Sequence, residues 1–351
     1  MNIKITGTGS YVPNKVLKNN DFLNHSFLTN DGTPFEIENK EIIEKFSSIT
    51  GIKERRYAAK SENSSDLAAK AAKKAILNSR TNQETIDYII VAHNFGDTPY
   101  GLKQSNPLPS VASKVKSLLE IKNPKCVAYD ILFGCPGWIE AVVQAKSFIK
   151  SGMAKKCLVI GTETLSRVVD VRDRDSMIFA DGAGATIIEE SNKLGGILSH
   201  ETVTYTDNGE VDILFFGESY EPDNKNQFIK MKGRKVYEFA LSHVPEAMKS
   251  CLDQSGVKIQ NLKKIFIHQA NEKMDEAIIK RFYRLYKEKV PPSVLPMNIE
   301  FNGNSSVATI PTLLDQVLNG EKKGHVLTEG DIILFASVGA GMNINAITYQ
   351  V

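Results

Sequence analysis

The strongest candidate for chemistry in this chain is Cys135. It follows the apolar run at residues 126–129 and a short turn, and it directly precedes Pro136 and the largely apolar sequence at residues 138–150. Pro favours the first position of a helix, so we expect Cys135 to lie between a strand and a helix N-terminus. Exposed amides and the positive end of the helix dipole favour a thiolate there, which makes Cys135 a candidate nucleophile. The alternative is a buried structural cysteine.

Two polar residues in the second half of the chain also stand next to apolar strands. His268 ends the apolar sequence at residues 264–268, and Asn304 lies in the turn Gly303–Ser306 that precedes a predicted helix. Taken alone, a histidine at a strand end is more often a packed or surface residue, and Gly-Asn-Ser-Ser is more often a turn. Together with Cys135 they favour one shared site, which we expect where buried central strands end.

Strands and helices alternate along the chain, which predicts an α/β fold with buried, mostly parallel sheets. The predicted strands are residues 3–5, 86–93, 126–129, 156–161, 179–188, 264–268, 331–337 and 344–350. The predicted helices are residues 40–47, 68–77, 110–119, 138–150, 236–255, 271–287 and 308–318, with a kink or break at Pro245 and an extended segment at 294–301. Both halves repeat one order of elements, so we expect a duplicated unit divided into residues 1–190 and 191–351.

Composition excludes several classes of protein. A net charge of +2 is too small to support binding to nucleic acid or to a membrane surface. No apolar run approaches the roughly 18 residues of a membrane span, and the N-terminus has no apolar core of signal-peptide length. The four cysteines include no C-x-x-C pair. We therefore expect reduced thiols, no metal site and a cytoplasmic location.

Six motifs, in order along the whole chain, carry a resemblance to a known family. They are Ile5–Pro13, Thr50–Arg56, the Cys135 turn, Asp181–Ala185, His268-Gln269-Ala270-Asn271 and Gly303-Asn304-Ser305-Ser306. In this set and order the chain resembles β-ketoacyl-acyl carrier protein synthase III, an initiating condensing enzyme of the thiolase-fold superfamily. The resemblance implies two pseudo-symmetric α/β halves stacked in layers as α-β-α-β-α.

The resemblance also implies a catalytic triad of Cys135, His268 and Asn304. The N–H groups of Cys135 and Gly341 would form an oxyanion hole. Cys135 would take an acyl group from a thioester, and His268 and Asn304 would stabilise the enolate formed when malonyl-acyl carrier protein loses CO₂. No cofactor is implied, because the substrates arrive as CoA or phosphopantetheine thioesters, and the enzyme is expected to be a homodimer.

Several positions depart from the family pattern. Lys45 and Ile49 stand where the family has a Trp and an Arg that hold the CoA adenine. Leu132 and Phe133 are bulkier than the usual residues before the cysteine, at the border of the acyl pocket. The loop at residues 94–109 is longer than usual, in a region that shapes the acyl tunnel across the dimer interface. These departures indicate an unusual primer, delivered by a carrier protein and used in fatty-acid initiation or in secondary metabolism.

The predicted helix after His268 offers a docking site for the acyl carrier protein. Lys273, Lys280 and Arg284 recur on one helical face, with Arg281 beside them. Carrier proteins present acidic helices, so a basic patch next to the active site suits such a partner. The alternative is an ordinary solvated charged face.

Two other functions compete with the condensing acyltransferase. One is a non-catalytic subunit that keeps the fold and pairs with a true ketosynthase in a heterodimer. The other is a thiolase-fold enzyme that joins two acyl-CoA chains head to head. The complete set of Cys135, His268 and Asn304 favours the enzyme over the non-catalytic subunit, which would have no reason to keep all three.

Overall fold

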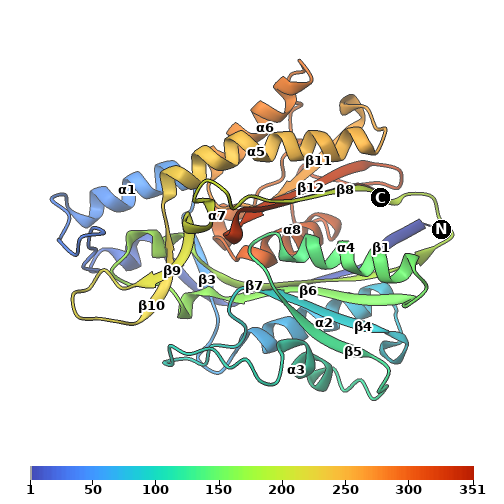
Figure 1. Cartoon of the computed structure of the whole chain (residues 1–351), viewed down its shortest axis with the longest axis horizontal. Helices are drawn as coiled ribbons and strands as arrows, with labels where there is room; N and C mark the ends of the chain where they lie inside the picture. Colours follow the sequence, from blue (N-terminus) through green and yellow to red (C-terminus); the bar gives the residue numbers. More distant parts are fainter. Residues whose placement is uncertain (1) are drawn as a thin grey trace.

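The chain is built on two β-sheets, which a computed structural model describes for residues 2–351 (Figure 1). The five-stranded sheet has the order β1 (Asn2–Tyr11), β7 (Asp181–Ser191), β6 (Lys156–Thr164), β4 (Tyr88–His93) and β5 (Val127–Leu132). The four-stranded sheet has the order β11 (Leu262–Ile267), β12 (Ile332–Gly339), β13 (Asn343–Gln350) and β8 (Gly196–Thr204).

Both sheets are mixed, so the prediction of mostly parallel sheets is wrong. In the five-stranded sheet β6, β4 and β5 are parallel, whereas β1, β7 and β6 alternate in direction. In the four-stranded sheet only the β11–β12 pair is parallel. The Gly339–Asn343 turn explains one antiparallel pair, because a connection this short can join only neighbouring antiparallel strands.

The two sheets share one pairing pattern, which supports the predicted duplication. In the orders β1-β7-β6-β4 and β8-β13-β12-β11, the first two pairs of neighbouring strands are antiparallel and the third pair is parallel. The fifth position beside β11 is taken by a segment in which the Val294 carbonyl accepts the N–H of Ile265 at 2.8 Å. This is the segment predicted to be extended, but it ends in the short helix α7 (Ile299–Asn302).

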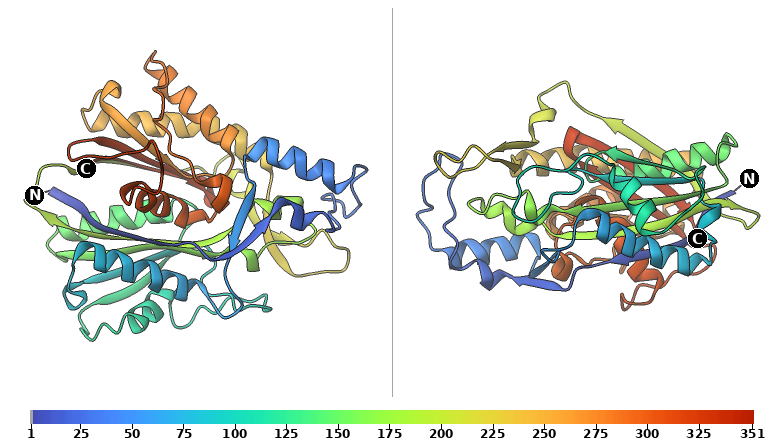
Figure 2. Two further views of the ribbon diagram at one scale, coloured as in Figure 1. Left: turned by 180° about the vertical axis from the view of Figure 1, so that it is seen from behind. Right: turned by 90° about the horizontal axis from the view of Figure 1, so that it is seen from below.

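Helices cover both outer faces and fill the space between the sheets. The outer helices are α2 (Ser64–Ser79) and α3 (Val111–Leu118) on the five-stranded sheet, and α5 (Gly233–Gln254) and α6 (Glu272–Leu285) on the four-stranded sheet. The central helices are α4 (Gly137–Lys150) and α8 (Thr309–Leu318), and Figure 2 shows α8 between the sheets from behind. The five layers follow the α-β-α-β-α order that the resemblance implied.

The central layer explains why the sequence of α4 is so apolar. Trp138, Ile139 and Val142 are each 1% exposed and pack in one cluster with Phe335 of β12 and Leu313 of α8. A helix that contacts a sheet on each side has little surface left for polar residues. Burial of each such side chain contributes roughly 1.5–3 kcal/mol to stability, so packing in the central layer holds α4 in place between the two sheets.

The remaining elements are short or were predicted with different bounds. Helix α1 (Asn39–Thr50) lies at one end of the molecule in Figure 1. The strands β2 (Lys15–Lys18) with β3 (Glu54–Tyr57), and β9 (Leu214–Glu218) with β10 (Gln227–Met231), form two antiparallel pairs that the sequence did not predict. Helix α5 runs through Pro245 without the predicted break, because its packing against α6 and the sheet outweighs one lost hydrogen bond.

Candidate active site

Cys135 lies in a tight turn that contacts the glycine-rich turn near the C-terminus. A Cβ atom added to Gly339 would lie 2.4 Å from the Cys135 nitrogen, and one added to Gly134 would lie 2.6 Å from the Ala340 nitrogen. Only glycine permits backbones to approach this closely. Two details correct the predictions: Pro136 is the N-cap of α4 and not its first residue, and β5 is an edge strand and not a central one.

Backbone hydrogen bonds position His268 directly after β11 and Asn304 in the turn after α7. The His268 N–H donates to the Ala336 carbonyl of β12 at 2.9 Å. The Asn304 N–H donates to the Ile178 carbonyl at 3.0 Å, and its own carbonyl accepts the Ala180 N–H at 2.8 Å. Both residues are 4% exposed. The second half of the chain is thus joined to the segment that leads into β7.

Ser306 links the three predicted residues, although no separate role was predicted for it. Its hydroxyl donates to the Cys135 sulfur at 3.2 Å, and its N–H donates to Asn304 Oδ1 at 2.7 Å. Its backbone also contacts the His268 ring. Ser306 has a φ of +51°, which a non-glycine residue adopts rarely and at a cost in strain. The structure therefore brings Cys135, His268 and Asn304 together around one serine.

Burial sets the protonation states of the nucleophile and the histidine. It raises the pKa of Cys135 to about 11, although the Ser306 hydrogen bond acts in the opposite direction. Burial thus favours the neutral thiol and acts against the thiolate that the helix N-terminus is expected to favour. Burial also lowers the pKa of His268 to about 4, against the effect of the Ser306 backbone. A neutral imidazole carries one N–H that can donate to a substrate.

Two further polar residues at this site were missed by the sequence analysis. Glu163 of β6 is 1% exposed, and its Oε1 accepts the Asn94 N–H at 2.8 Å and the Asn94 side-chain Nδ2 at 2.6 Å. Asn94 Nδ2 also donates to the Ser306 hydroxyl at 2.9 Å. Burial raises the pKa of Glu163 to about 7. The only signal in the sequence was Glu163 itself, a single carboxylate shortly after the apolar run Lys156–Gly161.

The two residues predicted to border the acyl pocket lie in different surroundings. Phe133 is half-buried beside the start of α4, and its N–H donates to the His93 carbonyl at 3.2 Å. Leu132 is 75% exposed, so it lines no pocket within one chain. The reason is that β5 is the edge strand and Leu132 is its last residue.

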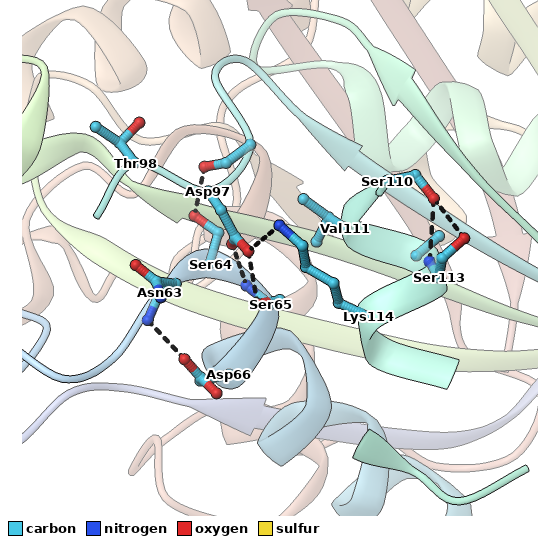
Figure 3. A network of polar contacts seen from close by, with 12 residues as sticks. Asn63, Ser64, Ser65, Asp66, Asp97, Thr98, Ser110, Val111, Ser113 and Lys114 are labelled. Carbon is cyan, nitrogen blue, oxygen red and sulfur yellow. Dashed lines mark hydrogen bonds and ion pairs between the residues drawn. The ribbon is translucent and has the colours of Figure 1, made fainter. Parts of the chain in front are cut away.

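The long loop at residues 94–109 is anchored at its beginning by Asp97 (Figure 3). The buried Asp97 carboxylate accepts the N–H and the hydroxyl of Ser65, both at 2.8 Å, and Lys114 Nζ at 2.9 Å. The Ser64 hydroxyl donates to the Gly96 carbonyl at 3.0 Å. These contacts tie the loop to α2 and α3, so Asn94 emerges from β4 in a fixed position.

The predicted docking residues lie on the outer surface of α6. Lys273 and Arg284 are exposed there, whereas Lys280 pairs with Glu276 at 3.3 Å. Arg281 donates to the Leu241 carbonyl of α5 at 2.9 Å. Lys273 and Arg284 are therefore the cations with the greatest freedom to meet a partner, and the face is less basic than its sequence suggested.

Lys45 and Ile49, the residues at the family's adenine-binding positions, are both exposed on α1. Ile49 is 49% exposed, and Lys45 forms an ion pair with Glu41 at 2.8 Å. Neither side chain presents an aromatic surface to a base.

Across residues 2–351 there is no cluster of three or more His, Cys, Asp or Glu residues suited to a metal ion. In that same range no helix has both the length and the apolar character needed to cross a membrane.

The layered pair of related sheets defines a condensing enzyme of the thiolase-like fold. The chain belongs to the 3-oxoacyl-[acyl-carrier-protein] synthase III family, whose model matches residues 129–206 and whose C-terminal model matches residues 252–351. It is 34% identical to the synthase III of Porphyra purpurea, over 100% of this chain and 99% of that protein.

Two solved structures of the same family agree over the whole chain. The synthase III of Aquifex aeolicus VF5 superimposes with a TM-score of 0.81 at 32% identity, covering 99% of this chain and 100% of that one. The synthase III of Thermus thermophilus gives a TM-score of 0.82 at 30% identity, covering 99% of both chains. The fold and family implied by the sequence motifs are confirmed.

Proposed function

We propose that this chain condenses an acyl group, held on Cys135, with a malonyl thioester on acyl carrier protein. The products are a 3-oxoacyl thioester and CO₂, as in the initiation of fatty-acid synthesis. The observation that carries the proposal is the meeting of Cys135, His268 and Asn304 around Ser306. A nucleophile with a neutral imidazole and an amide beside it is suited to acyl transfer followed by enolate chemistry.

In the first half-reaction the Cys135 sulfur attacks the carbonyl carbon of an acyl thioester. The C–S bond to the carrier breaks, and the departing thiolate takes up the proton that the cysteine has lost. The N–H groups of Cys135 and Gly341 are the proposed donors to the oxyanion. Contact between the Cys135 turn and Gly339–Ala340 supports this pairing, and losing one such donor typically costs about 10²–10³ in rate.

In the second half-reaction the malonyl group loses CO₂, and the electron pair of the broken bond forms an enolate. The His268 N–H and the Asn304 amide N–H donate to the enolate oxygen, so no general base is required. The carbanion then attacks the acyl carbon on Cys135, and the released thiolate takes up one proton. The pKa of His268, about 4, keeps the imidazole in the neutral form that this step needs.

The competing functions are less well supported. A non-catalytic subunit would have no reason to retain three side chains arranged around Ser306. A head-to-head condensing enzyme is disfavoured because the named relatives at 30% identity or more are synthases III.

We further propose that residues 1–190 and 191–351 are the two halves of the duplicated unit, and that the enzyme works in the cytoplasm. Free thiols at all four cysteines suit a reducing compartment.

The primer is proposed to arrive on a carrier protein and not on CoA. Lys45 and Ile49 offer no aromatic surface to adenine, and stacking on such a surface is worth about 1–3 kcal/mol. Losing it should weaken a CoA thioester by roughly one to two powers of ten while leaving the phosphopantetheine arm unaffected. Lys273 at the start of α6, five residues after His268, and Arg284 at its end are exposed cations. They are proposed to dock the acidic carrier, with Lys280 and Arg281 beside them.

Single-turnover loading followed by intact-mass measurement tests the proposal. We expect acetyl-acyl carrier protein to load the enzyme at least about 10-fold faster than acetyl-CoA at equal micromolar concentration. Malonyl-acyl carrier protein should then give 3-oxoacyl product and CO₂. The double charge reversal Lys273→Glu and Arg284→Glu should raise KM for the carrier only, while Lys323→Glu on a distant exposed loop serves as the control. Faster loading from acetyl-CoA would overturn the primer assignment, and absence of 3-oxoacyl product would overturn the function.

A homodimer through β5 is part of this proposal. Within residues 2–351, β5 ends the five-stranded sheet and leaves one row of backbone N–H and C=O groups without a neighbouring strand. Val127 and Leu132, at its two ends, are 47% and 75% exposed, and Leu108 of the adjoining loop is 80% exposed. An apolar edge strand of this kind normally pairs or is covered. Pairing with the β5 of a second copy would cover both edges and bring Leu132 against the partner.

Charge at this edge should break the dimer. We expect Val127→Lys to shift the protein from dimer to monomer in light scattering coupled to size-exclusion chromatography, because it places a charge at each end of the edge that the partner strand would cover. Val326→Lys, at a position 67% exposed on another surface, is the matched control. A variant at Val127 that stays dimeric at micromolar concentration would exclude this interface.

A further inference from the structure

Three polar side chains that the condensation chemistry does not use form a hydrogen-bonded chain that ends on the nucleophile. Glu163 Oε1 accepts Asn94 Nδ2 at 2.6 Å, and Asn94 Nδ2 donates to the Ser306 hydroxyl at 2.9 Å. The Ser306 hydroxyl then lies 3.2 Å from the Cys135 sulfur. The three residues come from the loop after β4, from β6 and from the turn before α8, so only tertiary folding brings them together.

The positions of the donors and acceptors determine the direction of each hydrogen bond from Asn94 to Glu163 and Ser306 and from Ser306 to Cys135. Glu163 Oε1 accepts from the backbone N–H and from the side-chain Nδ2 of Asn94, so the nitrogen end of the Asn94 amide faces the carboxyl group. The amide has two N–H bonds, of which one goes to Glu163 and the other to the Ser306 oxygen. Because the serine oxygen accepts from Asn94, its single O–H is left to point at the sulfur. A second hydrogen bond, from the Asn94 backbone N–H to Glu163 Oε1 at 2.8 Å, keeps Asn94 in position beside the carboxyl group.

These hydrogen bonds lie in a buried site, which increases their strength and the cost of breaking them. Glu163 and Ser306 are 1% and 4% exposed, and Glu163 stands at the end of an apolar strand. Hydrogen bonds are stronger in such a low-dielectric site, and each broken link leaves a buried polar group unpaired. A carboxyl group is costly to bury even with its two hydrogen bonds to Asn94, so its presence at this site calls for an explanation beyond packing.

We propose that Glu163, Asn94 and Ser306 are positioning residues that hold the Ser306 O–H on the Cys135 sulfur and so stabilise the thiolate. The inference rests on the proposed function in one respect only, that the thiolate is the form that attacks the acyl thioester. The chain transfers no proton itself. It supplies a directed donor to a sulfur that is otherwise enclosed by a turn and the start of a helix.

The pH dependence of Cys135 alkylation tests the inference without any acyl donor or carrier protein. Iodoacetamide reacts with the thiolate, so its rate at Cys135, located by peptide mapping, rises with the fraction ionised. We expect Ser306→Ala to lower the rate at pH 7.5 by about 10-fold or more and to move the profile to higher pH, as expected for losing a hydrogen bond to a charged group. Asn94→Ala should lower the rate less, by about 3-fold, because the Ser306 O–H can still reach the sulfur but is no longer held in that direction. This variant keeps the charge of Glu163, which by itself raises the pKa of Cys135.

The neighbouring serine provides a matched control. Ser305→Ala removes a hydroxyl from the same buried turn but not the one that contacts the sulfur, so its profile should match the wild type. Circular dichroism establishes that each variant is folded, and Asn94→Ala decides the question if Ser306→Ala is not. An unchanged alkylation profile in a folded Ser306→Ala or Asn94→Ala variant would overturn the inference. Because no condensation is measured, this outcome is distinct from a failure of the proposed function.

Discussion

Replacing Cys135 by alanine is expected to abolish acyl loading from every thioester donor, by about 10³-fold or more in rate. The variant has no atom to carry the acyl group, so the mass increase seen with wild-type protein should be absent. Peptide mapping of the wild type should find the adduct on Cys135 alone. The other three cysteines are at most 2% exposed, so an acyl thioester cannot reach their sulfurs, whereas Cys135 is partly exposed.

Cys126→Ala is the matched control for this experiment. Cys126 is 2% exposed and lies just before β5, so its loss removes a thiol close in sequence to the site without touching the turn. Loading of this variant should equal that of the wild type. Acylation that persists in Cys135→Ala, or an adduct that maps to Cys126 or Cys251, would contradict the assignment of the nucleophile.

Substitution of His268 or Asn304 should separate the two half-reactions. His268→Ala is expected to lower decarboxylation of malonyl-acyl carrier protein by about 10²-fold or more, because one donor to the enolate oxygen is lost. For Asn304 the sharper variant is Asn304→Asp. The new carboxylate still offers an oxygen to the Ser306 N–H, which now donates to Asn304 Oδ1 at 2.7 Å, but it has no N–H for the enolate.

The measurement compares two rates in the same variants. Release of CO₂ from malonyl-acyl carrier protein reports the second half-reaction, and single-turnover formation of acyl-Cys135 reports the first. We expect Asn304→Asp to lose decarboxylation while keeping most of its loading rate. If both rates fall equally in Asn304→Asp, the residue serves to hold the Ser306 turn, and the enolate has a different second donor.

The sequence by itself predicted the nucleophile, its two partners and the helices that follow them. Each of these signals is local. Cys135 stands in a strand–turn–helix sequence, His268 follows a short apolar strand, and Asn304 precedes an apolar helix. The repeated order of elements also predicted two related halves, since the order of strands and helices along a chain is readable from hydrophobic pattern.

Strand direction and strand position were decided only by the tertiary structure. An apolar run reads the same in a parallel or an antiparallel pair, so the sequence could not show that both sheets are mixed. The same limit hid the edge position of β5, whose residues Val127–Leu132 include enough apolar side chains to resemble a central strand. Exposure of Leu132 follows from that position and not from its own residue type.

The hydrogen-bonded chain behind Cys135 also depended on tertiary structure. Asn94 and Glu163 are neighbours because β4 and β6 pair in parallel, and Ser306 reaches them from the other half of the chain. Taken singly, they read as a loop residue, a strand-end carboxylate and a turn serine. A relation among residues 94, 163 and 306 has no local signature in sequence, because it arises where two halves of the fold meet at the end of a sheet.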